Sequence, residues 1–148
     1  MPIFDIKFNS KTRHIEDRVY LEGEITIGDY IERFFSSTDT WNKSMYQHQW
    51  KEGIARLKEH EISCLIMGIT TLSTNPRIVY CGLYKKEAIV YFQPKPLMRY
   101  GYNELARDLP PFNKYTCYQY ICTDVRINKK GGGDEWSLPL ETVLKFLD

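Results

Sequence analysis

The sequence has little that would mark it for export, for a membrane or for a strongly charged partner. Its 148 residues carry a formal net charge of +1, so no overall field attracts nucleic acid or anionic lipid. No apolar run approaches the roughly 20 residues that span a bilayer. The first residues also lack the basic and apolar segments of a secretory signal. We therefore expect a cytoplasmic protein with no membrane partner, and we do not expect nucleic acid as its ligand.

Cysteine is scarce as well. The four cysteines fall in strand-like segments, at Cys64, Cys81, Cys117 and Cys122. Without an export signal, such residues are expected to be reduced and to pack as small buried hydrophobic side chains. Cys117 and Cys122 are five residues apart, which directs them to opposite faces of a strand. A disulfide between neighbouring strands remains an alternative.

Catalytic and metal-binding patterns are also missing. His60-Glu61 begins like a zinc-protease helix but lacks the second histidine, and the glycine run that follows Lys130 lacks the Gly-Lys-Ser/Thr of a phosphate-binding loop. His14 and His48 have no evident partner in the sequence, although a Cys–His pair formed in space remains open. The prediction is a protein that is not an enzyme, with no catalytic residue, no metal and no cofactor.

Alternating and apolar runs predict several strands. Residues 3–8 and Val19–Ile27 alternate as half-solvated strands do, whereas the polar segment Asn9–Asp17 predicts a turn. Asp29–Phe35 is undecided, because its apolar residues have helical spacing in a short segment. Ile62–Thr71 is apolar on both faces, which predicts a central strand.

A hairpin and one further strand are predicted after Ile62–Thr71. Residues 77–84 and 88–93 predict a hairpin with the tip at Lys85–Glu87. Tyr115–Ile127 is the longest strand-like run.

One helix is well marked. Asn42 or Ser44 can cap it, and an apolar stripe follows at i, i+4, i+8 and i+11, formed by Tyr46, Trp50, Ile54 and Leu57. Gly53 in its interior is costly unless a strand backbone passes close by. A second helix is predicted near the C-terminus, capped by Ser137.

The expected fold is α+β, with residues 1–148 as a single domain. It consists mainly of an antiparallel twisted sheet, a meander, with one main helix (about 43–60) packed on it and a C-terminal helix (about 138–147).

The order of several segments resembles a known family. Glu24–Glu32 is followed by Trp41 and the main helix; later come Leu83-Tyr84 and Val90–Gln93, and the end carries Glu135-Trp136 followed by Leu140, Val143, Leu144 and Phe146. This order is similar to that of contact-dependent growth inhibition immunity proteins (the CdiI family), of the type whose fold is likened to the Whirly single-stranded-DNA binders. The resemblance runs from about Glu24 to the C-terminus and contains no catalytic signature.

This resemblance implies a small cytoplasmic bacterial protein that binds and neutralises the C-terminal toxin domain of a surface-delivered effector, as a heterodimer. Such toxins are frequently nucleases. The resemblance assigns Trp41, Trp50 and Trp136 to the core. The net charge of +1 departs from the acidic character frequent among nuclease inhibitors.

Tyrosines and carboxylates in irregular segments and on a wet strand face are the predicted toxin-binding groups, since such anchors dominate many interfaces. They are Tyr100, Tyr102, Glu104 and Asp108 in a long loop, and Tyr118, Tyr120 and Asp124 on the last long strand. Glu22, Glu24, Asp29 and Glu32 form a second acidic strip, or ordinary surface charge. The alternative function is a single-stranded nucleic-acid-binding domain that stacks bases on the tyrosine-bearing strand.

Overall fold

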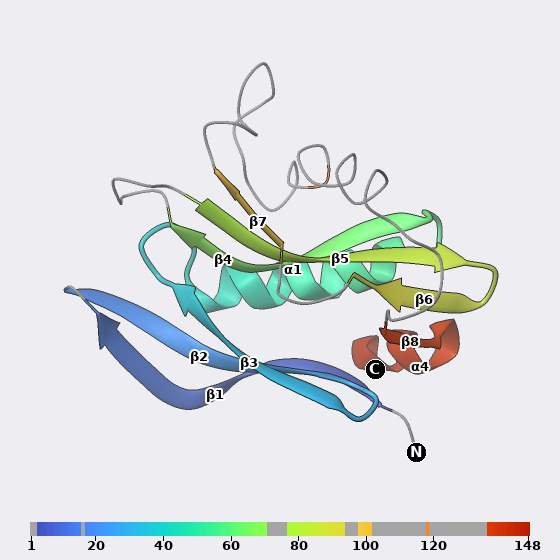
Figure 1. Ribbon diagram of the computed structural model, residues 1–148, viewed down its shortest axis with the longest axis horizontal. Helices are drawn as coiled ribbons and strands as arrows, with labels where there is room; N and C mark the ends of the chain where they lie inside the picture. Colours follow the sequence, from blue (N-terminus) through green and yellow to red (C-terminus); the bar gives the residue numbers. More distant parts are fainter. Residues whose placement is uncertain (1–2, 16, 71–76, 94–97, 102–117, 119–135) are drawn as a thin grey trace.

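The computed structural model describes residues 3–15, 17–70, 77–93, 98–101, 118 and 136–148. Within these residues, two antiparallel sheets and one long helix build the fold (Figure 1). The α+β prediction is confirmed. The strands divide into two sheets, however, rather than forming one meander.

The first sheet is a three-stranded meander in the order β1-β2-β3. Its strands are β1 (Phe4–Ile15), β2 (Arg18–Ile27) and β3 (Tyr30–Ser37). The turn predicted over Asn9–Asp17 is wrong for most of that segment, which continues β1. An irregularity between Phe8 and Thr12 accommodates the polar residues, and there the Lys11 amide donates to Asn9 Oδ1 (2.8 Å). Asp29–Phe35, undecided from sequence, is mostly strand.

The second sheet has five strands. They are β4 (Ile62–Thr70), β5 (Arg77–Lys86), β6 (Ile89–Phe92), β7 (Met98–Gly101) and β8 (Trp136–Pro139), in the order β4-β5-β6-β8 with β7 also paired to β5. The predicted hairpin is confirmed, but its turn lies at Glu87-Ala88 and not at Lys85–Glu87, because Lys85 and Lys86 still pair with Val90 and Ile89. Among the described strands, β4 ends this order and pairs with β5, so the central position expected for it is not found there.

Helix α1 (Lys43–Arg56) begins where the sequence predicts. The side chain of Asn42 accepts a hydrogen bond from the Met45 amide (2.9 Å). The helix ends at Arg56 with Leu57 as its C-cap, before the predicted end near residue 60, because the chain turns over residues 57–59 into β4. The predicted apolar stripe is confirmed, since each of its four residues is at most 1% exposed.

The C-terminal segment differs from the prediction. Trp136–Pro139 forms β8 and pairs with β6, so Ser137 lies opposite Tyr91 and does not cap a helix. Helix α4 (Leu140–Leu144) and the 3₁₀ turn η1 (Lys145–Leu147) follow, without a side-chain cap at Pro139. The edge of β6 offered pairing partners to these residues, and local helix signals could not reveal that.

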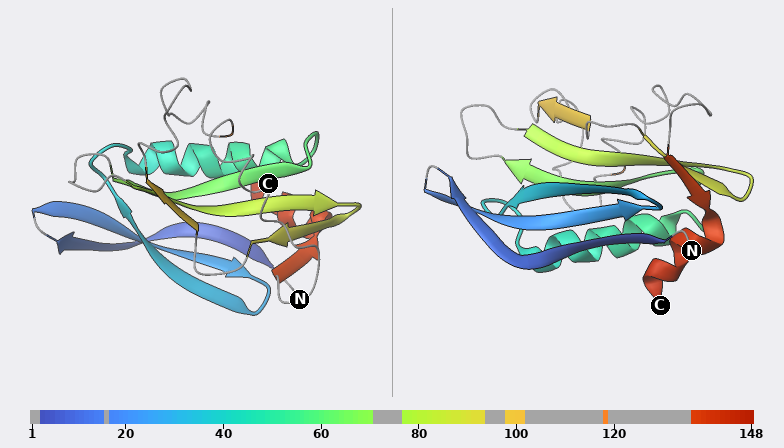
Figure 2. Two further views of the ribbon diagram at one scale, coloured as in Figure 1. Left: turned by 45° about the horizontal axis from the view of Figure 1, so that its top comes forward. Right: turned by 60° about the horizontal axis from the view of Figure 1, so that its bottom comes forward.

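Aromatic side chains join the sheets and α1 into one core. Phe4 of β1 stacks on Phe92 of β6, with ring centroids 5.4 Å apart. Trp50 of α1 contacts Phe8 (4.8 Å) and Phe34 (5.8 Å) of the first sheet. Helix α1 therefore contacts both the first sheet and β4 (Figure 2).

Candidate protein-binding surface

Side chains of α1 close the open edge of β4. Gln49 Nε2 donates to the Cys64 carbonyl (2.9 Å), and the Ile66 amide donates to Gln49 Oε1 (2.7 Å). Trp50 Nε1 donates to the Ile66 carbonyl (2.7 Å). Buried backbone groups need such partners. These bonds explain how the edge of β4 can be buried without a neighbouring strand among the described residues.

The same pattern extends beyond the middle of β4. The Ile69 amide donates to the Tyr46 hydroxyl (3.0 Å), which itself donates to the Ser37 carbonyl of β3 (2.7 Å). Burial raises the pKa of Tyr46 above its ordinary range, so the hydroxyl stays protonated. Tyr46 therefore links α1 to both sheets.

Gly53 allows the close approach of α1 and β4. A Cβ at this position would collide with the Cys64 carbonyl oxygen, and the Ser63 hydroxyl donates to the Gly53 carbonyl (2.7 Å). Arg56 Nε donates to the Ile62 carbonyl (3.2 Å) at the other end of the contact. We call this contact, from Tyr46 to Arg56 against β4, the α1–β4 junction.

Tyr118 belongs to this junction. Its backbone is helical, which contradicts the strand predicted there. Its hydroxyl accepts a hydrogen bond from Gln49 Nε2 (3.2 Å), and the Arg56 guanidinium lies 4.5 Å from its ring centroid. Tyr118 is half-buried, so a role in toxin binding would use the remaining exposed part of its side chain.

Of the other predicted toxin-binding residues, the structure describes one. Tyr100 lies on β7, where it pairs with Ile78 of β5. The remaining residues lie outside the part of the chain that the structure describes: Tyr102, Glu104, Asp108, Tyr120 and Asp124. Of the three tryptophans assigned to the core, Trp41 and Trp50 are buried, whereas Trp136 is half-buried and contacts the Tyr30 ring (4.2 Å).

The thiols in the described ranges are poor candidates for chemistry. Cys64 and Cys81 are buried, as predicted, and neither forms a disulfide with a described residue. Burial, assisted by the Glu32 carboxylate, raises the pKa of Cys81 to about 12, so little thiolate exists at neutral pH. His14, His48 and His60 are exposed, and His48 Nε2 lies 3.1 Å from Glu52. No group of three or more His, Cys, Asp or Glu within these ranges could hold a metal ion.

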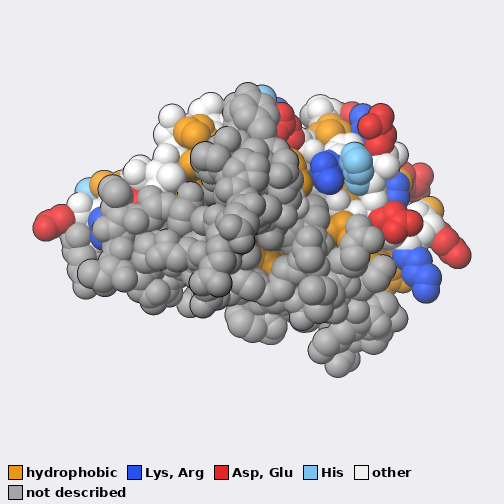
Figure 3. Space-filling model, turned by 90° about the horizontal axis from the view of Figure 1, so that it is seen from above, with side chains coloured by type: hydrophobic (Ala, Val, Ile, Leu, Met, Phe, Trp, Pro, Cys, Tyr) orange, Lys and Arg blue, Asp and Glu red, His pale blue; other side chains and the backbone are white. Residues whose placement is uncertain are grey.

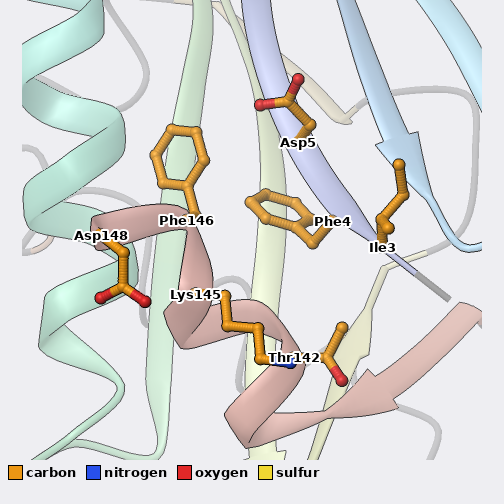
Figure 4. Close-up of a pocket in the computed structure, with 7 residues that line it drawn as sticks. All are labelled: Ile3, Phe4, Asp5, Thr142, Lys145, Phe146 and Asp148. Atoms are coloured by element: carbon orange, nitrogen blue, oxygen red, sulfur yellow. The ribbon is translucent and has the colours of Figure 1, made fainter. Parts of the chain in front are cut away.

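One open pocket of about 410 Å³ lies between the start of β1 and the C-terminal helices (Figure 4). Phe4 and Phe146 meet edge to face within it, with centroids 5.5 Å apart. Its charged groups differ in sign and come from separate elements, with Asp5 on β1 and Lys145 and Asp148 at the chain end. They do not converge on one point, so the pocket lacks the arrangement of a catalytic site.

Exposed hydrophobic side chains gather elsewhere. The large ones in the described part of the chain all belong to the first sheet or adjoin it: Ile3, Ile15, Val19, Ile31 and Phe35. On the face seen in Figure 3, hydrophobic side chains of described residues are visible in several places beside charged ones. Ile31 is the most exposed of the five, at 59%.

The strand register places two of these residues on one surface. Ile31 and Phe35 of β3 lie opposite Thr26 and Glu22 of β2. Their side chains alternate with buried Phe34 and therefore face away from the core. We call this surface the outer face of the first sheet; it comprises Lys7, Arg13, Glu22, Glu24, Thr26, Ile31, Arg33 and Phe35.

Charges on the outer face alternate in sign. Glu24 lies between Lys7 of β1 and Arg33 of β3 in the register. The Arg13 guanidinium lies 4.9 Å from the Phe35 ring centroid. The acidic strip predicted from sequence is divided: Glu32 lies opposite Ile25 on the inner side, where it helps burial to raise the pKa of Tyr30 to about 12.

Two comparisons with known proteins give a match. The family model described as the CdiI N-terminal domain matches residues 36–146. In fold, the structure is similar to a chain of the "CdiA-CT/CdiI toxin and immunity complex from Enterobacter cloacae", with a TM-score of 0.76 and 21% sequence identity over 98% of this chain and 96% of that chain. No curated protein sequence matches. No helix among the described residues is long and apolar enough to cross a membrane.

Proposed function

Because the chain belongs to the CdiI family, we propose that it is an immunity protein that binds and neutralises the C-terminal toxin domain of its cognate contact-dependent growth inhibition effector. The family match over residues 36–146 carries this proposal. The fold supports it, since it extends over nearly the whole length of a chain taken from a toxin and immunity complex.

The proposed mechanism is occlusion by surface contact, without any bond-making by this chain. An interface of standard size, about 800 Å² on this partner, is sufficient for specific binding. The raised pKa of Cys81 supports a non-catalytic role for that thiol. The exposed hydrophobic side chains of the first sheet could be buried in such an interface.

Binding is tested with the toxin domain encoded beside this gene. Mixed at micromolar concentrations, the two proteins should co-elute as a heterodimer and release heat in a titration. Co-expression should restore growth to cells that produce the toxin domain. A folded protein that neither binds the toxin domain nor protects these cells would refute the proposal.

We further propose that the toxin is a nuclease acting in the cytoplasm, where this protein meets it. Incubation of the purified toxin domain with RNA and with DNA tests this step by itself. Cleavage that stops on addition of the immunity protein is expected. A toxin with another activity would refute the nuclease proposal and leave the immunity function intact.

The toxin-binding role of Tyr100, Tyr102, Glu104, Asp108, Tyr118, Tyr120 and Asp124 stays a prediction. It can be tested by alanine replacement in the same binding assay. Tyr118 is the least informative of these positions, because its replacement also removes the Gln49 and Arg56 contacts.

A further inference from the structure

We infer that the toxin domain docks on the outer face of the first sheet, with Ile31 and Phe35 as its apolar anchors. This inference rests on the proposed function and adds the surface that performs it. The surface does not include the two sequence-predicted residues that the structure describes, Tyr100 on β7 and Tyr118 at the α1–β4 junction.

The distribution of exposed hydrophobic side chains is the first argument. Single exposed apolar residues are ordinary on a protein surface, but contiguous ones mark interaction sites. Ile31 (59% exposed) and Phe35 (38% exposed) point to the same side of β3 and flank Arg33, so the three side chains form one exposed row of two apolar groups and a charge. Neither the helix α1 nor the described part of the five-stranded sheet carries a comparable pair.

Charge on this face supplies the second argument. Glu24 and Arg33 lie directly opposite each other on β2 and β3. Within the described residues, however, neither side chain forms an ion pair. A partner that presents a basic group to Glu24 and an acidic group to Arg33 would match both charges and fix the orientation of docking. The expected partner surface therefore has an acidic group between two apolar ones, and a basic group beside it.

The size of the face is consistent with the centre of an interface. Three strands spaced by about 4.8 Å and eight residues long, at about 3.4 Å per residue, present roughly 400 Å² in projection. A standard interface needs about 800 Å² from each partner. The exposed Ile15, opposite Arg18 at the end of the β1–β2 hairpin, lies on the same side and extends the apolar surface toward that value.

The boundary of the family match also supports the first sheet as the docking surface. The match begins at residue 36, so β1, β2 and nearly all of β3 lie outside it. A surface on this sheet can differ between relatives while the matched core stays the same. Such an arrangement suits proteins that share a fold but each bind their own partner.

The test combines two substitutions with matched controls. Ile31→Asp places an uncompensated charge at one apolar anchor, and Arg33→Glu reverses the charge between the two anchors. Each should weaken binding of the toxin domain at least about tenfold. Ile31→Val and Arg33→Lys should retain binding within about twofold, as should Lys51→Glu on the exposed side of α1. Unchanged thermal unfolding of all variants shows that they remain folded.

A protection experiment gives a second readout. In the variant Ile31→Cys, the new thiol is expected to react readily with a maleimide in the free protein and at least tenfold more slowly in the complex, measured on the peptide by mass spectrometry. Equal rates in both states would overturn the inference.

The outcomes separate the two proposals. If the wild-type protein does not bind the toxin, the proposed function fails and the inference with it. If the wild-type protein binds and the Ile31→Asp/Arg33→Glu double variant binds equally well, the inference alone is overturned. Loss of binding in a Tyr102→Ala/Asp108→Ala variant with unchanged binding of the double variant would favour the sequence-predicted surface instead.

Discussion

The α1–β4 junction and the outer face of the first sheet differ in the exposure and the bonding of their side chains. At the junction, Gln49 and Trp50 are nearly inaccessible and satisfy backbone groups of β4. On the outer face, Ile31 is 59% exposed and Arg33 forms no ion pair within the described residues. The side chains of the first region stabilise buried backbone groups, whereas on the outer face Ile31 and Arg33 are available to another molecule.

The largest contrast is expected between Trp50 and Ile31. Replacing Trp50 by alanine removes the indole from between α1 and the first sheet and leaves the Ile66 carbonyl without its donor. We expect Trp50→Ala to lower the free energy of unfolding by about 3–5 kcal/mol. Ile31→Ala should change it by no more than about 0.5 kcal/mol. Urea titration measures both, and comparable losses would refute the contrast.

A second comparison uses two glutamines on the same helix. Gln49→Leu keeps most of the side-chain volume but leaves the Cys64 carbonyl and the Ile66 amide without these partners. A loss of about 2–3 kcal/mol is expected, since each buried unsatisfied group costs about 1–3 kcal/mol. Gln47 is exposed, so Gln47→Leu serves as the control and should be nearly neutral. An equally small effect at Gln49 would mean that these hydrogen bonds do not stabilise the edge of β4.

Gly53→Ala tests how closely the helix and strand approach. Helix propensity alone would favour alanine by about 1 kcal/mol, but its Cβ would collide with the Cys64 carbonyl oxygen. We expect a net loss of about 1–3 kcal/mol, as for overpacked cores. Lys51→Ala, on the exposed side of the same helix, should not destabilise by a comparable amount. Stabilisation by Gly53→Ala would contradict the geometry of the junction.

The smallest expected effect is a pH dependence within the core. The folded protein raises the pKa of Cys81 from an ordinary value of 9.0 to about 12. As the pH rises, the unfolded chain therefore loses this proton first. The contribution of the protonated thiol to the free energy of unfolding is complete below pH 9 and is lost as the pH rises toward 12. Between pH 8 and 10 the loss should be about 1 kcal/mol. The free energy of unfolding should fall less steeply with pH in Cys81→Ala than in the wild type. Equal slopes in the two proteins would show that Cys81 does not cause this pH dependence.

Local patterns predicted α1 and the β5–β6 hairpin well. The Asn42 cap and the apolar stripe from Tyr46 to Leu57 are signals contained in a few neighbouring residues. The position of β4 could not be predicted in this way. Its residues are apolar on both faces like those of a central strand, yet among the described elements it is a helix that covers its second edge.

The candidate surface was harder to find from sequence. Ile31 and Phe35 have a spacing that suits a helix as well as a strand, so the segment stayed undecided and its exposed side could not be assigned. Which side of β3 faces the core is decided by Trp50, which packs on Phe34 from a different part of the chain. The sequence analysis therefore placed the interface on tyrosines, and one of these, Tyr118, proved to contact α1.

The way in which α1 covers β4 also has a consequence for aggregation. An uncovered edge strand is a template to which further chains can add, as in amyloid. Ile62–Thr70 is apolar throughout most of its length and would be a hazardous template if it were bare. Because Gln49, Trp50 and Tyr46 already occupy its outward backbone groups, fibril growth from this edge would first require α1 to detach.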